Sequence, residues 1–315
     1  MQPVVPFIPE AQSHERTVWQ QELSRSLRDL AELKPFETLS EEERLAARVA
    51  IVANPDPAHV AALPNLVWVQ SLWAGVERLM SELPETGPLI VRLADPQMAE
   101  TMSEAVLAWT LYLHRDMPRY MLQQRRGVWQ EHFLKTPAER TVGVLGLGNL
   151  GSASAQRLKA NGFTVTGWSR SAKSVGGVRS FHGPDGLRQL LGEADIVVVL
   201  VPLTDATRGL LGEDEFRACK EGAALINFAR GPVIDTDALV GTLDAGHLSH
   251  AVLDVFDEEP LPSDNPLWRN EKVTVLPHIS APTIISTASR LVARNLQAFL
   301  ETGTVPEHVD RKRGY

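Results

Sequence analysis

A glycine-rich turn, Gly146-Leu147-Gly148-Asn149-Leu150-Gly151, is the feature that most constrains how this chain can fold. It follows an apolar segment, 141–145, typical of a buried strand, and it leads into a segment with helical character, 151–160. In this order the first glycine permits a tight turn, the second lets the backbone approach a pyrophosphate, and the third allows close helix packing. The N–H groups at the helix start attract the same anion. We therefore predict a dinucleotide site here; the alternative is a glycine-rich turn with no ligand.

The chain has 315 residues, more than one hydrophobic core usually supports, which predicts two domains. Apolar segments recur regularly after residue 140, and helical segments separate most of them. These predicted strands are 141–145, 164–168, 196–200, 224–227, 250–253 and 273–276. Apolar strands that alternate with helices are typical of an α/β fold: a doubly wound, Rossmann-type parallel sheet covered on both faces.

Residues 1–95 alternate short apolar segments with helical ones, which predicts a smaller, flavodoxin-like α/β domain. Pro6 interrupts its first strand pattern and favours an edge position or a shorter strand. A long apolar helix, 99–115, is a candidate connector, and a helix at 283–301 is placed to return the chain to the first domain. We expect a substrate domain at 1–98 plus 286–315 and a nucleotide domain at 99–285.

Composition excludes several classes of function. The net charge of −8 gives no general attraction to nucleic acid or to an anionic membrane. The single cysteine, Cys219, excludes an internal disulfide and fits a reducing, cytoplasmic compartment. The first ten residues lack the pattern of a signal peptide, and the longest apolar run, 196–203, is too short to span a membrane.

The end of the second predicted strand indicates which dinucleotide binds. NAD sites usually have an acidic residue about 20 residues beyond the glycines, where it binds the ribose 2′-OH. This chain instead has Ser169 and Arg170, with Lys173 close by. These side chains suit a 2′-phosphate, so NADP(H) is the preferred cofactor while use of NAD(H) is left open. The alternative is that Arg170 is a solvated surface residue.

Polar residues also follow three later apolar strands, in the segments 227–232, 254–261 and 277–281. Strand ends of a doubly wound sheet point into one ligand crevice. We therefore expect these three segments to converge. They lack the close ligand spacing of a metal site, so no metal is expected.

With these segments the chain resembles the D-isomer-specific 2-hydroxyacid dehydrogenase family, in its glyoxylate/hydroxypyruvate reductase branch. The motifs that carry the resemblance span most of the chain and occur in the family's order. They are Trp73-Ala74-Gly75-Val76, Met98-Ala99-Glu100, the glycine turn, Pro202-Leu203-Thr204 and the three segments above.

The resemblance implies a role for each matched residue. It makes Arg230 the substrate anchor, Glu259 the acid that orients and polarises the histidine, and His278 the general acid/base. For the substrate it adds Trp73, Ala74 and Gly75. For the cofactor it adds Pro202, Thr207, Phe228, Ala229, Asp254, His278 and Ser280 to the glycine turn and to the 169–173 segment.

The chemistry of keto-acid reduction requires the same kinds of catalytic group. Reducing a keto group leaves negative charge on oxygen, so a proton donor that titrates near neutrality is needed, and histidine serves. Arg230 can hold a planar carboxylate with a bidentate fork. Taken singly, His278 also fits a core histidine, Arg230 an ion-pair partner and Glu259 a solvated acid; together they favour catalysis.

We therefore predict an enzyme that reduces a small 2-keto acid, glyoxylate or hydroxypyruvate, with NADPH. The competing hypothesis is a dinucleotide-sensing interaction module like the corepressors that share this fold. A homodimer is expected from the family and from the broad apolar surface of 99–115. The sequence alone assigns no role to the segment 120–136.

Overall fold

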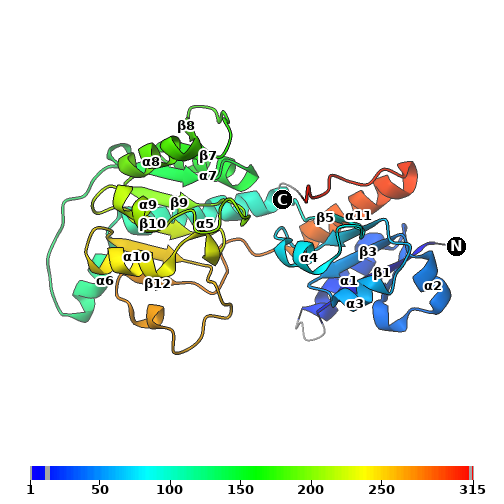
Figure 1. Cartoon of the computed structure of the whole chain (residues 1–315). Coiled ribbons are helices and arrows are strands. Elements are labelled where there is room, and N and C mark those ends of the chain that lie inside the picture. Colours follow the sequence, from blue (N-terminus) through cyan, green and yellow to red (C-terminus); the bar gives the residue numbers. More distant parts are fainter. Residues whose placement is uncertain (1, 11–14, 312–313, 315) are drawn as a thin grey trace. The chain divides into compact units, whose positions relative to one another are not determined.

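The structure is a computed structural model that describes residues 2–10, 15–311 and 314. Residues 1, 11–14, 312–313 and 315, which belong to the expected spans 1–98 and 286–315, lie outside the described residues. The chain divides into two compact units, Met1–Gln97 with Thr283–Tyr315 (unit 1) and Met98–Pro282 (unit 2) (Figure 1). The expected boundaries differ from these by one and three residues. The first of them falls inside helix α5 (Pro96–His114).

Unit 2 is built on a seven-stranded, wholly parallel sheet in the order β12-β11-β10-β9-β6-β7-β8. Its strands are β6 (Thr141–Leu145), β7 (Thr164–Ser169), β8 (Arg179–His182), β9 (Ile196–Val199), β10 (Ala224–Asn227), β11 (His250–Leu253) and β12 (Val273–Val275). Its helices beside α5 are α6 (Met117–Arg125), α7 (Asn149–Ala160), α8 (Gly183–Glu193), α9 (Glu213–Ala218) and α10 (Thr236–Asp244).

Both faces of this sheet are covered, which explains why its central strands β9 and β10 are apolar except for Asn227 at the end of β10. One core packs side chains of α8, α9 and α10 against the sheet, and a second packs α5 and α7 against it. Every residue of β9 and β10 is buried. The strand order reverses between β6 and β9, the topological switch point at which such sheets bind ligands beyond their carboxyl ends. The predicted doubly wound sheet is confirmed.

Unit 1 contains a five-stranded parallel sheet in the order β2-β1-β3-β4-β5, the flavodoxin-like arrangement. Its strands are β1 (Val4–Pro9), β2 (Glu32–Pro35), β3 (Val49–Ala53), β4 (Trp68–Ser71) and β5 (Leu89–Val91). Its helices are α1 (Arg16–Leu27), α2 (Glu41–Ala46), α3 (Pro57–Ala61), α4 (Glu77–Glu82) and α11 (Ile285–Thr302). The smaller α/β fold predicted for this part of the chain is confirmed.

Helix α11 belongs to unit 1 although it follows unit 2 in the sequence. Its Val292 and Leu296 are buried in the same core as Trp19 and Leu23 of α1. The Asn295 side chain also donates a hydrogen bond to the Gln70 side chain, at 2.8 Å. The helix expected at 283–301 from its place after the large sheet thus has one face buried in unit 1.

The expectation for Pro6 was wrong, because β1 is an interior strand flanked by β2 and β3. The pairing of β1 with β3 begins only at Phe7, one residue beyond the proline. Pro6 is in register with Lys34 of β2 but lies before the ladder with β3 begins, so the interior strand tolerates its missing N–H. No helix within the described residues is long and apolar enough to cross a membrane.

Candidate active site

The glycine turn connects β6 to α7, and its backbone geometry requires glycine at two positions. Gly146 has a φ of +103°, and a Cβ there would lie 2.7 Å from the Leu200 carbonyl oxygen. A Cβ on Gly151 would lie 1.7 Å from the carbonyl oxygen of Gly146. Any side chain at either position would force the turn or the helix to move.

Gly148 differs, because a Cβ built on it meets no atom within 4 Å. It is the N-cap of α7, and the backbone N–H groups of the first helical turn have no intrahelical acceptor. The open space above Gly148 and these N–H groups suit an anion held close to the backbone. Asn149, Leu150 and Gly151 form that first turn, so the residues present fit the pyrophosphate of a dinucleotide.

The predicted 2′-phosphate residues lie at the carboxyl end of β7. Arg170 and Lys173 are exposed, whereas Ser169 is buried and its hydroxyl donates to the Ser171 carbonyl oxygen at 2.8 Å. Lys173 Nζ donates to the Leu147 carbonyl oxygen at 3.2 Å, which brings this loop to the glycine turn. Ser169 thus shapes the loop, and the two cations carry its positive charge.

Thr207 holds together the turn that follows β9. Its hydroxyl donates to the Pro202 carbonyl oxygen at 2.6 Å and accepts the Thr204 backbone N–H at 2.8 Å. Thr207 is buried while Pro202 is exposed. The structure therefore joins the two predicted cofactor residues of this segment, with Thr207 fixing the position of Pro202.

The segment after β10 presents Arg230. Phe228 and Ala229 are buried and Arg230 is half-buried, with its Nη1 donating to the Ala229 carbonyl oxygen at 2.7 Å. Asn227, the last residue of β10, is fully buried and was not among the predicted site residues. A polar residue that ends an otherwise apolar strand was the available signal.

His278 and Glu259 form the central pair of the candidate active site. His278 Nδ1 lies 2.7 Å from Glu259 Oε2, and Glu259 Oε1 accepts the Phe256 backbone N–H at 2.9 Å. The His278 side chain is 52% exposed, which excludes a core role. Because Glu259 occupies Nδ1, the other ring nitrogen, Nε2, is the one left to exchange a proton with a substrate.

His278 has a φ of +53°, an uncommon conformation for a residue with a side chain. Asp254, which is 2% exposed, accepts the Ile279 N–H on Oδ1 at 2.7 Å and the Ser280 N–H on Oδ2 at 2.9 Å. A left-handed residue costs about 1–2 kcal/mol. Hydrogen bonds to a charged group contribute about 1.5–3 kcal/mol each, so these two suffice to hold the turn.

Two buried polar atoms at the predicted site lack a partner within the described residues: Ser280 Oγ in unit 2 and Trp73 Nε1 in unit 1. Trp73 is half-buried and packs edge-on against Trp19, with ring centroids 6.0 Å apart. Its own backbone N–H donates to Ser71 Oγ at 3.0 Å. Trp73, Ala74 and Gly75 belong to unit 1, and the other predicted site residues belong to unit 2.

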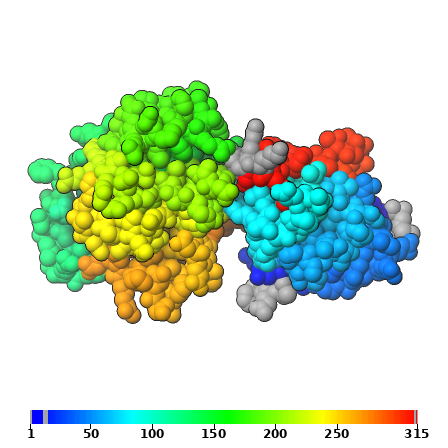
Figure 2. Space-filling view, viewed as in Figure 1, coloured from blue at the N-terminus to red at the C-terminus, as the bar shows by residue number. Residues whose placement is uncertain are grey.

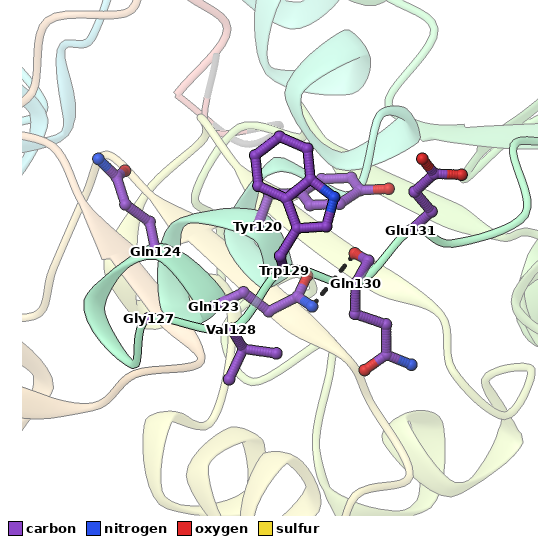
Figure 3. A pocket seen from close by; sticks show the side chains of 8 residues that line it. All are labelled: Tyr120, Gln123, Gln124, Gly127, Val128, Trp129, Gln130 and Glu131. Atoms are coloured by element: carbon purple, nitrogen blue, oxygen red, sulfur yellow. Dashed lines mark hydrogen bonds between the residues drawn. The ribbon is translucent and has the colours of Figure 1, made fainter.

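Segment 120–136, unassigned from the sequence, comprises the end of α6 and an extended chain on the outside of unit 2 (Figures 1 and 2). A surface hollow of about 470 Å³ lies against it, lined by Tyr120, Gln123, Gln124, Gly127, Val128, Trp129, Gln130 and Glu131 (Figure 3). None of these belongs to the predicted site. In the described part of the chain, no group of three or more His, Cys, Asp or Glu could hold a metal ion.

Comparison with known proteins places this geometry in a family. Residues 107–280 match the family described as "D-isomer specific 2-hydroxyacid dehydrogenase, NAD binding domain". A glyoxylate/hydroxypyruvate reductase A of Yersinia enterocolitica is 38% identical over 277 residues, which cover 85% of this chain and 88% of the relative.

Solved structures agree over the whole chain. A D-isomer specific 2-hydroxyacid dehydrogenase of Xanthobacter autotrophicus, in complex with NADPH and MES, is 37% identical with a TM-score of 0.91, covering 100% of both chains. The NADPH-dependent glyoxylate/hydroxypyruvate reductase of Sinorhizobium meliloti, in complex with NADP and sulfate, is 30% identical with a TM-score of 0.85, covering 99% of this chain and 100% of that one. The resemblance drawn from the sequence is confirmed: the chain belongs to the D-isomer specific 2-hydroxyacid dehydrogenases, in the branch of the glyoxylate/hydroxypyruvate reductases.

Proposed function

We propose that the chain reduces a small 2-keto acid, glyoxylate or hydroxypyruvate, to the corresponding 2-hydroxy acid with NADPH. The observation that carries the proposal is the 2.7 Å contact of His278 with Glu259, in loops that follow strands of the same sheet as the glycine turn. The names of the Yersinia and Sinorhizobium relatives support the substrate class. Substrates of this size carry one carboxylate and one carbonyl, which Arg230 and His278 are suited to recognise.

NADP(H) is the cofactor in this proposal. Arg170 and Lys173 supply positive charge where an acidic residue would select NAD, and two related structures contain NADPH or NADP. The glycine turn would hold the pyrophosphate, and the unpartnered Ser280 hydroxyl is available to the cofactor. When bound, the reduced nicotinamide supplies the hydride.

The chain's own residues supply binding and the proton. Arg230 binds the substrate carboxylate and thereby orients the carbonyl. His278 donates the proton from Nε2 to the carbonyl oxygen, where negative charge develops. Glu259 holds the ring through Nδ1, fixes which nitrogen carries the exchangeable proton, and stabilises the imidazolium.

The turn after β4 is proposed as a second substrate-binding segment. Because Ser71 already accepts the Trp73 N–H, the backbone N–H groups of Ala74 and Gly75 are the donors for a carboxylate. Trp73 is held by its contact with Trp19, so it would act as a fixed wall that limits substrate size. Trp73→Ala is expected to extend activity toward bulkier keto acids such as phenylpyruvate.

A homodimer completes the proposal, although the argument from α5 is weaker than expected. Most apolar side chains of α5 pack in unit 2's own core, and Leu111 is 38% exposed. Larger exposure is found in the segment after α6, where Trp129 is 96% and Phe133 102% exposed. Sedimentation of the parent and of Trp129→Ser/Phe133→Ser tests it: a monomeric parent refutes the dimer. A cytoplasmic location and the absence of nucleic-acid or membrane partners stay predictions.

The test of activity follows NADPH and NADH absorbance with glyoxylate, hydroxypyruvate, pyruvate and phenylpyruvate as acceptors. We expect NADPH oxidation with glyoxylate and hydroxypyruvate, and a loss of about 10²–10⁴-fold in kcat for His278→Ala. His308→Ala, an exposed histidine of unit 1, is the matched control. If neither cofactor is oxidised with any acceptor, the reductase proposal fails and the interaction-module alternative is left.

A further inference from the structure

Two buried polar residues lie side by side at the carboxyl ends of neighbouring strands in unit 2. Asn227 ends β10 and is 0% exposed, and Asp254 directly follows β11 and is 2% exposed. The register pairs Asn227 with Leu253, and the Asp254 N–H donates to the Asn227 carbonyl oxygen at 3.1 Å. The two residues are therefore joined through the backbone of the sheet.

The Asn227 side chain clamps the segment that carries Arg230. Its Nδ2 donates to the Arg230 carbonyl oxygen at 3.1 Å, and its Oδ1 accepts the Ala229 N–H at 3.1 Å. Both ends of one amide are thus used on two consecutive residues. A buried amide with both ends satisfied fixes the local backbone strongly, because no water replaces a lost partner.

The Asp254 side chain does the same for the segment that carries His278. Its two oxygens accept the N–H groups of Ile279 and Ser280, the residues that follow the left-handed His278. Asp254 also has lone pairs left for the cofactor role that the family resemblance implies. The clamp is a separate role, since it acts on the chain's own backbone.

We propose that Asn227 and Asp254 form one positioning unit that sets the substrate anchor and the proton donor relative to each other. This inference rests on the proposed function, because it assigns the two clamps to Arg230 and His278. A catalytic group must be held within about 0.5 Å of its productive position, and a displacement of about 1 Å lowers rates by about 10²-fold. Neither residue is itself the group that grips the substrate carboxylate or donates the proton.

The kinetic test separates the two clamps. Asn227→Ala should raise the keto-acid KM about tenfold with kcat changed less than about twofold, because Arg230 binds the carboxylate before and during reaction. Asn227→Asp, of the same size, loses the Nδ2 donor and should act in the same direction if the alanine variant folds poorly. Asp254→Asn should lower kcat about 10²-fold, because His278 donates its proton in the chemical step.

The double variant tests whether the two residues act as one unit. We expect the kcat/KM loss of Asn227→Ala with Asp254→Asn to fall short of the product of the single losses by about fivefold or more. Losses that multiply would overturn the unit and leave two independent residues. A KM and kcat that change equally in every variant would indicate general damage and would also overturn it.

Amide hydrogen exchange gives a readout that does not depend on activity. Asp254→Asn should exchange the Ile279 and Ser280 amide protons about tenfold faster or more than the parent, since one charged acceptor is lost. Asp195→Asn is the matched control: that buried carboxylate accepts the Thr141 N–H at 2.8 Å, at the amino end of the same sheet. It should alter neither KM, nor kcat, nor the exchange of those two amides.

These readouts distinguish the two proposals. If the parent reduces no keto acid, the proposed function fails, while faster exchange in Asp254→Asn would still show that this clamp holds the segment. Unchanged exchange at Ile279 and Ser280 in that variant would overturn the positioning role whatever the activity.

Discussion

Replacing Gly148 with alanine separates the stability of unit 2 from its binding of NADPH. Gly148 has φ −75° and ψ −164°, a conformation that alanine adopts, and a Cβ there meets no atom within 4 Å. Removing glycine's freedom in the unfolded chain stabilises by about 0.4–1 kcal/mol. The preference of helix N-caps for glycine over alanine offsets this, so the free energy of unfolding should change by less than about 1 kcal/mol.

The same methyl group should weaken cofactor binding, because it fills the space through which a pyrophosphate approaches the α7 N-terminus. A loss of about 1.4 kcal/mol in binding free energy corresponds to a tenfold rise in Kd. We expect at least that rise for NADPH. The substitution should therefore act on the cofactor and hardly on the fold.

Gly151→Ala is the contrasting variant from the same turn. Its Cβ would lie 1.7 Å from the Gly146 carbonyl oxygen, which is backbone and cannot rotate away. We expect a large loss of stability there, as for other changes that overpack a core.

Thermal unfolding and NADPH fluorescence titration measure both effects. A change of about 1 kcal/mol corresponds to about 2–4 °C in Tm for a domain of this size, so Gly148→Ala should melt within that range of the parent. An NADPH Kd within twofold of the parent would refute the assignment of the glycine turn to the pyrophosphate. If Gly148→Ala melted at as low a temperature as Gly151→Ala, the inference that a methyl group at position 148 meets open space would be refuted.

Three further substitutions test other parts of the reasoning. Arg170→Ala should raise the KM for NADPH about 10–100-fold, because one hydrogen bond to a charged group is lost, and should leave the KM for NADH nearly unchanged. Equal effects on the two KM values would contradict recognition of the 2′-phosphate. Glu259→Gln should lower kcat about 10–100-fold, because the amide keeps the size of the side chain but loses the charge that stabilises the His278 imidazolium. A kcat equal to that of the parent would contradict the proposed role of Glu259 beside His278. Burial lowers the pKa of His250 from 6.5 to about 4. As pH falls, the His250 imidazole is protonated in the unfolded chain before it is protonated in the folded one. About 3 kcal/mol of the free energy of unfolding that is present above pH 6.5 is therefore lost between pH 6.5 and pH 4. Urea unfolding of His250→Gln should show a smaller loss of stability over this pH range.

The sequence predicted the sheet of unit 2 well because its strands are apolar on both faces. Strands such as β9 and β10, in which every residue is buried, are short apolar runs that lack the 3.6-residue period of an amphipathic helix. β8 was missed because it is a four-residue edge strand without a fully buried residue. β2 gives only a weak strand pattern in the sequence, because the charged residues Glu32 and Lys34 interrupt it.

The site was predictable in its residue types and less so in its connections. The histidine and the acid were recognised because each follows an apolar strand within a family motif. The clamp from Asp254 to Ser280 joins residues 26 positions apart, and it depends on which strands are neighbours. Asn227 gave a weaker signal still, because a single polar residue at a strand end also fits an ordinary turn.

Comparing Asp195 with Asp254 shows why position in the sheet matters more than residue type. Both are buried carboxylates that accept backbone N–H groups from a neighbouring segment. Asp195 lies before β9, where it also binds Lys220 at 2.8 Å, and the segments it ties carry no proposed chemistry. Asp254 lies after β11, where the segment it ties contains His278. The same hydrogen-bonding device therefore supports the fold at the amino end of the sheet and the proposed reaction at the carboxyl end.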